Sequence, residues 1–410
     1  MNKALAKGLI IVSVASLFYL FMFFVRVLPT IMVGDLQRDL GITAKGIGLI
    51  TSSFVIPYAL VQIPSGIIID RVGVKKIMVL GMIGSMIGCL MFQYSTSYIL
   101  PTFARALIGI SCGAAFIAPM TLVKQWLPER MFSTAAGMIQ LLGCVGAMLS
   151  IPLSHLVSDI GWRDTFTLSA IIAASLTIIF MIMIKEKHEE SLSEDSNILS
   201  SLKVIFGDKR YWCVGIIAMT SWAIIGGFSE SFGINFLSTL QGISIPEATT
   251  QMSWVWIGVA VASPLSGYWY EHAHNKRLPL IIVLIMSLAS FLVLLLGLTQ
   301  NKLLIKLLLF LSGFSAGAQP IAFGLVAHIS AENTMATAVS FCNTCVIAGA
   351  FILQPLVSLL VDASMLSRYM GSTQTTELTN FLLIDYQIGF TPIVAVVILG
   401  LIISIQAKWN

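Results

Sequence analysis

The chain has 410 residues, of which 57% are hydrophobic and 10% are charged, with a mean hydropathy of +0.93 and a formal net charge of +4. Soluble domains carry about 25% charged residues, so lipid is the expected solvent for most of this chain. The composition therefore disfavours a soluble enzyme or a nucleic-acid-binding domain. All six cysteines lie in apolar stretches, and the lone Cys342-x-x-Cys345 pair is interpreted as helix packing.

Twelve stretches are long and apolar enough to cross a membrane, which takes about 20 residues. In the first half they are Gly8–Ile31, Gly46–Ile69, Ile77–Tyr94, Tyr98–Leu122, Ala135–Val157 and Thr165–Ile184. In the second half they are Trp212–Phe236, Met252–Tyr270, Leu278–Leu298, Leu303–Ile329, Ala336–Val361 and Ile388–Ile405. The predicted fold class is an all-α polytopic membrane protein with 12 transmembrane helices.

The loops predict the orientation and the domain organisation. With the N-terminus inside, the inner segments hold fifteen Lys and Arg residues and the outer segments hold five, and basic loops stay in the cytoplasm. Both termini are therefore expected to be cytoplasmic. The charge-dense segment 185–210 is predicted to be a cytoplasmic linker between a six-helix half, 1–184, and a second half, 211–410. Segment 362–387 is predicted to be an outer loop, and the chain has no phosphate-binding loop for an ATP-driven motor.

The two halves align on each other with a nearly constant offset, which indicates an internal repeat of six helices. A shift of 201 to 204 residues superimposes Gly66 on Gly267, Asp70 on Glu271, Arg105 on Lys306, Gly146 on Gly349, and Arg26 on Glu230. Both halves start inside, so the repeat is parallel. Secondary transporters are often built in this way, with the substrate site at the repeat interface.

A glycine-rich and charged motif follows the second predicted span. It reads Gly66-Ile-Ile-Ile-Asp70-Arg71-Val-Gly73-Val74-Lys75-Lys76. Glycines allow close helix packing and tight turns. Asp70 ends a helix beside basic residues, and its expected partners are Arg71, Arg130 or the N-terminus of a neighbouring helix.

This motif resembles the signature loop of the major facilitator superfamily, G-x-x-x-D-R-x-G-R-[RK]-[RK], with Val74 in place of an arginine. Pro128-Glu129-Arg130 and Gly161-Trp162-Arg163 lie where that family has similar residues. The resemblance implies a secondary transporter, not an enzyme, in which the motif latches one of two alternating states. The gate residues are then Gly66, Asp70, Arg71, Gly73, Lys75, Lys76, Glu129, Arg130, Gly267 and Glu271.

A second, narrower resemblance concerns the first two spans. The stretches FVRVLPTIMVGDLQRDLGI and YALVQIPSGIIIDRVG look like the phagosomal transporter group of intracellular gammaproteobacteria. That group imports amino acids or nucleosides. The resemblance implies a nutrient importer in a bacterial inner membrane.

Four ionisable residues lie well inside the predicted spans: Arg26, Arg105, Glu230 and Lys306. Charges in a membrane are costly and mark a pathway or binding site. The family resemblance places their helices, the first, fourth, seventh and tenth, around a central cavity. Three cations and one anion favour a substrate with a carboxylate, which arginine binds by two parallel hydrogen bonds. Three roles are open for Glu230: binding a substrate ammonium, exchanging a proton, or pairing permanently with a cation.

Six neutral polar residues are further candidates for ligand contact or interhelical hydrogen bonds: Tyr19, Tyr58, Gln62, Gln140, Gln319 and Asn343. The leading hypothesis is proton-coupled uptake of a carboxylate-bearing nutrient such as an amino acid or short peptide. The alternatives are an exporter, or an exchanger of organic anions, nucleosides or sugars. A membrane enzyme or receptor is a remote alternative. No metal, cofactor or nucleic acid is expected, and the chain is expected to be a monomer.

Overall fold

The computed structural model describes residues 3–41, 44–187, 198–370 and 382–406, and these residues form helices with no β-strand among them. They cluster into two compact units. The first unit contains Met1–Gly207 and Ala327–Thr344, and the second contains Asp208–Val326 and Cys345–Asn410. Helix α17 (Met335–Met370) therefore has residues in both units.

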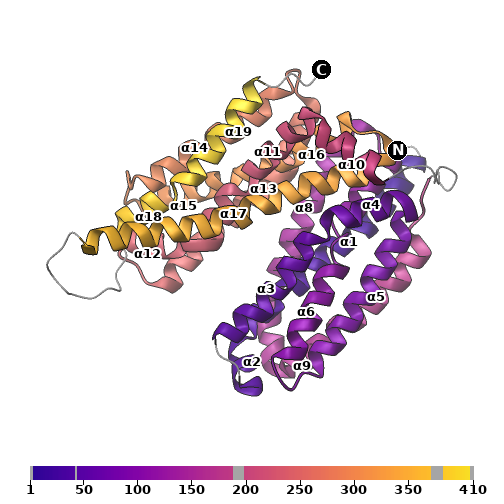
Figure 1. Cartoon of the computed structure of the whole chain (residues 1–410), viewed down its shortest axis with the longest axis horizontal. Coiled ribbons are helices and arrows are strands. Elements are labelled where there is room, and N and C mark those ends of the chain that lie inside the picture. The colour runs from indigo at the N-terminus through magenta and orange to yellow at the C-terminus, as the bar shows by residue number, and fades with distance from the viewer. Residues whose placement is uncertain (1–2, 42–43, 188–197, 371–381, 407–410) are drawn as a thin grey trace. The chain divides into compact units, whose positions relative to one another are not determined.

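The first unit is a helical bundle in which α3, α5 and α6 lie side by side (Figure 1). Helix α1 packs against α7, α8 and α9, and α5 also packs against α9. The elements of this unit are α1 (Lys3–Ile31), α2 (Val33–Leu40), α3 (Ala44–Leu60), α4 (Gln62–Val72), α5 (Val74–Gln93), α6 (Ile99–Ser111), α7 (Ile117–Trp126), η1 (Glu129–Met131), α8 (Phe132–Met148), α9 (Ser150–Met183), α10 (Ile198–Gly207) and η4 (Glu332–Thr334). Helix α10 lies in the second part of the predicted linker.

The second unit pairs its helices in the same way. Helix α15 packs against α13 and α14, and α19 packs against α11 and α14. The elements are α11 (Lys209–Ile224), η2 (Ile225–Phe232), α12 (Gly233–Gln241), α13 (Ile245–His272), α14 (Arg277–Leu295), α15 (Lys302–Gly313), η3 (Phe314–Gly317), most of α16 (Ala318–Ile329), most of α17, α18 (Leu383–Gly389) and α19 (Thr391–Gln406).

The described residues include nine helical segments that are long and apolar enough to cross a membrane, or ten if the bent pair Leu49–Leu60 and Gln62–Val72 is one span. These ten coincide with ten of the twelve predicted spans. The eighth prediction falls on α13, a helix of 28 residues. The fourth falls on α6 and α7.

The fourth span is not the continuous helix that the sequence predicted. Helix α6 ends at Ser111, α7 begins at Ile117, and a turn separates them. The amide of Gly113 donates to Ile110 and that of Ala115 to Cys112, which is the three-residue spacing of a tight turn. The second unit has a 3-10 turn, η3, at the corresponding place between α15 and α16.

Glycine contacts show how the two units repeat each other. A Cβ atom on Gly109 would lie 2.4 Å from the Phe54 carbonyl oxygen, and one on Gly313 would lie 2.2 Å from that of Val255. Residues 54 and 255 differ by 201, but residues 109 and 313 differ by 204. The helices thus align Arg105 with Leu309, and the predicted equivalence of Arg105 and Lys306 is wrong by about one turn.

The predicted outer loop at 362–387 is shorter than expected. Helix α17 continues to Met370 and α18 begins at Leu383, while residues 371–381 lie outside the described part. The fully buried Asp385 accepts hydrogen bonds from Arg368 and from the Ser364 hydroxyl, the latter at 2.7 Å. This pairing holds the end of α17 against α18, and a hydropathy pattern does not reveal it.

Candidate functional site

Asp70, in the last turn of α4, caps the first turn of α17. Its Oδ1 atom is 3.0 Å from the amide nitrogen of Ala336, and its Oδ2 atom is 2.9 Å from that of Thr337. The Thr337 hydroxyl also donates to Oδ2, at 2.6 Å. The first amides of a helix lack partners within it, and the helix dipole favours an anion there. Three partners were expected for Asp70: Arg71, Arg130 or a helix N-terminus. These hydrogen bonds identify the N-terminus of α17 as a partner.

Gly66 brings α4 into close contact with the same turn of α17. A Cβ atom at this position would lie 2.4 Å from the Ser340 hydroxyl oxygen and 2.6 Å from the Ala336 carbonyl oxygen. The carbonyl belongs to the backbone and cannot rotate away as a side chain would. Gly66 and Asp70, one helical turn apart, thus act together: the first allows the approach and the second bonds the helix end.

Replacing Asp70 with alanine should loosen the first turn of α17. Loss of a capping carboxylate costs about 0.5–2 kcal/mol, so the amides of Ala336 and Thr337 should exchange hydrogen faster by roughly tenfold. Hydrogen exchange with mass spectrometry measures this. Asp362→Asn is the control because Asp362 is an exposed residue of the same helix. Equal exchange in D70A and the native protein would contradict the capping role.

A carboxylate that the sequence did not single out caps helix α5. Glu186 accepts from the amide of Val74 at 3.2 Å and from that of Lys75 at 2.8 Å. Gly73, with φ of 96°, provides the turn, and a Cβ atom there would lie 2.8 Å from the Glu186 carboxylate. The start of the linker is therefore attached to the signature loop. Val74, which stands in place of the family's arginine, is buried.

Most of the other charged gate candidates are exposed. Glu129, in η1, is 3.9 Å from the Lys124 ammonium and 3.4 Å from His328 Nδ1. Exposed pairs of this kind stabilise a protein by about 0–1 kcal/mol. In the second unit, Lys276 donates to the Glu271 carbonyl at 2.7 Å. Arg71, Lys76 and Arg130 are exposed, Lys75 is half-buried, and Gly267 is buried in α13.

Arg105 is fully buried and connects α6 to α1. Its Nη1 atom donates to the Val25 carbonyl at 2.9 Å and its Nη2 atom to the Arg26 carbonyl at 3.0 Å. Pro29 follows Val25 by four residues within α1 and has no N–H to offer that carbonyl. Arg105 supplies the missing donor, and its guanidinium lies 4.5 Å from the centre of the Phe54 ring.

Arg26 has a different environment from Arg105. It is half-buried on α1, and its guanidinium lies 5.5 Å from the centre of the Phe23 ring. Within the described part of the first unit, none of the ion pairs includes Arg26. The exposed part of the Arg26 guanidinium is therefore available to bind an anion.

The neutral candidates of the first unit form two hydrogen-bonded groups. The Tyr19 hydroxyl donates to the Gln140 side chain at 3.0 Å, and the buried Gln140 Nε2 atom has no partner among the described residues. Asn343 donates to the Gln62 side chain at 2.8 Å, next to Tyr58. These bonds connect helices, as the alternative interpretation expected, while the unused Gln140 amide remains a donor for another group.

Glu230 lies in an unusually wide helical turn. Segment η2 is a π-helix, and Ser231 departs from helical geometry with φ of −116° and ψ of −108°. Gln354 of α17 donates to the Gly226 carbonyl at 3.2 Å and lies 3.5 Å from Glu230 Oε2. Glu230 and Gln354 line a cavity of about 460 Å³ between η2 and α17. Wide turns of this kind are frequent at functional sites.

The remaining candidates of the second unit lie apart from this cavity lining. Lys306 is half-buried, five residues into α15. Gln319, near the start of α16, is 3% exposed, and its Oε1 atom has no partner among the described residues. A buried carbonyl oxygen without a donor costs free energy, so Gln319 is suited to accept a hydrogen bond from a ligand or water.

Several residues of these sites escaped the sequence reasoning. Thr337, Glu186 and Phe54 lie at helix ends or in apolar runs where nothing in the sequence marks them. Gln354 could have been found, because it is a neutral polar residue inside the eleventh predicted span, as Asn343 is. The Gly226-Gly227 pair is a weaker sequence indication of the π-helical turn than Gln354 is of a polar contact.

Comparison with known proteins supports a transporter. The sequence profile of the Major Facilitator Superfamily matches residues 13–354. An uncharacterized transporter, YybO, from Bacillus subtilis is 24% identical over 88% of this chain and 87% of its own length. A probable sulfoacetate transporter, SauU, from Cupriavidus necator is 22% identical over 60% of this chain, which spans 56% of that relative's length.

The solved structures agree on the fold. The fucose:proton symporter FucP of E. coli superimposes with a TM-score of 0.75 over 98% of this chain and 100% of the symporter, at 16% sequence identity. Similarity at this level of identity concerns the fold alone. It matches the helical architecture described above.

Proposed function

Because the chain belongs to the major facilitator superfamily and is therefore a secondary transporter rather than an enzyme, we propose that it carries a small organic anion with a carboxylate group across a bacterial inner membrane. Alternating access is the proposed cycle, in which the cap of Asp70 on α17 holds one state. Both termini are proposed to be cytoplasmic. The proposal also treats the chain as two six-helix halves joined by the linker.

The observation that carries this proposal is the environment of Arg26. A half-buried guanidinium without an ion pair in the described part of its unit is costly in a membrane, and a substrate carboxylate would offset that cost. Arg105 is less suited because two of its nitrogens already bond to backbone carbonyls. The name of the sulfoacetate relative, which refers to a carboxylate-bearing anion, agrees with this choice.

Glu230 is the proposed proton site. Its carboxylate lines the cavity between η2 and α17, and the Gln354 amide lies 3.5 Å from its Oε2 atom. None of the relatives reported above is named for amino acids, so an ammonium-binding role has less support than proton exchange. An exporter or an exchanger of organic anions remains the second candidate, since Multidrug resistance protein D of E. coli is also similar, at 23% identity over 60% of the chain.

Uptake by purified protein in liposomes tests the anion proposal. Labelled dicarboxylates, uronates, carboxylated sulfonates, amino acids, nucleosides and neutral sugars are offered in turn. A carboxylate should be selected, and Arg26→Gln should raise its apparent KM by about 10–100-fold, since a hydrogen bond to a charged group contributes about 1.5–3 kcal/mol.

The matched control is Arg38→Gln, because the Arg38 side chain is 72% exposed and pairs with Asp35 on the short helix α2. It should leave the KM within twofold of the native value. Selection of a neutral sugar or nucleoside, or an unchanged KM in R26Q, would contradict the assignment of Arg26 to an anion.

A further inference from the structure

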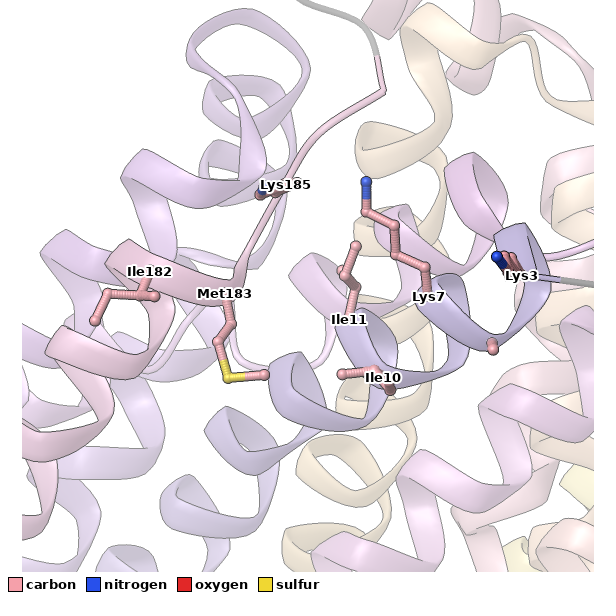
Figure 2. Close-up of a pocket in the computed structure, with 8 residues that line it drawn as sticks. Lys3, Lys7, Ile10, Ile11, Ile182, Met183 and Lys185 are labelled. Carbon is pink, nitrogen blue, oxygen red and sulfur yellow. The ribbon is translucent and has the colours of Figure 1, made fainter.

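A cavity unrelated to the transport candidates lies between the first turns of α1 and the last turn of α9. Its volume is about 370 Å³, and its walls are Ile10 and Ile11 on α1 and Ile182 and Met183 on α9. In Figure 2, Lys7 and Lys185 lie together on one side of this apolar floor, and Lys3 lies on the first turn of α1. The cavity thus has one basic rim and one apolar floor.

The lysines of the rim have no carboxylate partner among the residues that the structure describes. Within the described part of the first unit, no ion pair includes Lys3, Lys7 or Lys185. The nearest carboxylate along the chain, Glu186, already accepts from two backbone amides of α5. Three positive charges therefore border a cavity that contains no anion from these residues.

Trp126 fixes the rim in place. Its indole N–H donates to the Lys185 carbonyl at 2.8 Å, and the ammonium groups of Lys7 and Lys187 lie 5.0 and 5.1 Å from its ring centre. The indole thus holds two parts of the rim, the Lys7 ammonium by a cation–π contact and the Lys185 backbone by a hydrogen bond, without cancelling a charge. The rim is therefore organised before any ligand arrives, which lowers the entropic cost of binding.

Part of the apolar floor is exposed at the surface of the helices. Ile10 is 54% exposed and Ile182 is 68% exposed, and both lie near the ends of membrane-crossing segments. A ligand that fits both the rim and the floor has an anionic head and an apolar tail. Basic pockets between membrane helices at the cytoplasmic side bind anionic lipid head groups, and the basic loops predict that this end is cytoplasmic.

We propose that this cavity binds one anionic phospholipid, whose phosphate lies among Lys3, Lys7 and Lys185 and whose acyl chain begins along Ile10 and Ile182. The site lies within the first unit and uses none of the residues assigned to substrate or proton. Binding would hold the start of α1 to the end of α9. The occupant is a lipid rather than free phosphate because the floor is apolar and open to the bilayer side.

Native mass spectrometry of the full-length protein in detergent tests this with added phosphatidylglycerol, with phosphatidylcholine as the neutral lipid. The native protein should retain one phosphatidylglycerol more tightly than phosphatidylcholine. The triple variant Lys3→Gln, Lys7→Gln and Lys185→Gln should lose at least tenfold in affinity. The variant that carries arginine at the same three positions should bind as the native protein does, which separates loss of charge from loss of folding.

The matched control removes the same number of positive charges away from the cavity. It carries Lys203→Gln, Lys209→Gln and Lys302→Gln, all at exposed positions. Equal losses in the two triple glutamine variants would overturn the site in favour of a general charge effect. Soluble glycerol phosphate tests whether the bound anion is a lipid or a free phosphate. If it does not displace phosphatidylglycerol, the lipid is supported, whereas displacement at equal concentration would overturn the proposal of a lipid. Equal retention of the two lipids would also overturn the proposal.

Discussion

Glu230→Gln should abolish uphill uptake driven by a proton gradient and leave downhill exchange of substrate intact. A carboxylic acid and its amide have nearly the same shape, but only the acid can release a proton. Glutamine therefore mimics the protonated state permanently, and a carrier that moves in that state continues to alternate. The cavity between η2 and α17 should keep its shape in either case, because the substitution only replaces one carboxylate oxygen with an amide nitrogen of similar size.

The measurement is uptake into liposomes with and without an imposed pH gradient, together with counterflow. The native protein should accumulate substrate severalfold or more under the gradient, E230Q should show no accumulation, and both should show counterflow. Glu247→Gln is the matched control because Glu247 pairs with Lys302 at the exposed start of α13 and α15. Gradient-driven accumulation by E230Q would remove the proton role, while loss of counterflow as well would indicate a role in binding.

Arg105→Met should lower the thermal stability strongly, and Pro29→Ala should partly restore it. Methionine keeps much of the volume of arginine but cannot donate to the Val25 carbonyl. An unpaired carbonyl inside a membrane protein costs several kcal/mol, so we expect a fall in Tm of roughly 5 °C or more. Alanine at position 29 returns an N–H to the fourth residue after Val25, where a regular helix has its donor.

The double-mutant cycle isolates this one contact from other losses at the buried position. The Tm fall caused by R105M should be smaller in the P29A background than in the native background, and the difference measures the coupling between the two sites. Arg163→Met, at a partly exposed arginine that bonds to the Ser95 carbonyl and to Asp39, controls for removal of a guanidinium. Additive effects of R105M and P29A would contradict the role of Arg105 as the replacement donor.

The sequence was sufficient for the fold class and for the signature loop, since both depend on local patterns. Long apolar runs reveal membrane helices, and Asp70 stands in a short motif with fixed spacing. The capping of α17 was among the expected partners for that reason. The structure was needed to identify Thr337 as a hydrogen-bond donor to Asp70. Thr337 lies 267 residues away, and no sequence motif marks it.

The four charges inside the predicted spans stand out in the sequence, but the sequence does not distinguish their roles. Arg105 and Arg26 are the same residue type in similar apolar runs. Only the structure shows that Arg105 completes the backbone of a proline-containing helix, whereas the described residues offer the Arg26 guanidinium no backbone carbonyl. A charged side chain in a membrane can donate hydrogen bonds to backbone carbonyls of a helix or bind a ligand, and hydropathy does not distinguish these two roles. The π-turn at Glu230 escaped for a related reason, since its one extra residue per turn leaves the apolar pattern almost unchanged.

The glycine contacts of α6 and α15 also bear on the history of the chain. Gene duplication followed by divergence leaves backbone contacts in place while side chains change, and Gly109 on Phe54 matches Gly313 on Val255 in this way. At the aligned position beside these contacts, one copy has Arg105 and the other has the buried Leu309. The two units thus share these backbone contacts, but the side chains at the aligned position differ in charge. The close glycine contacts therefore set the same helix spacing in both units, while the side chains beside them differ.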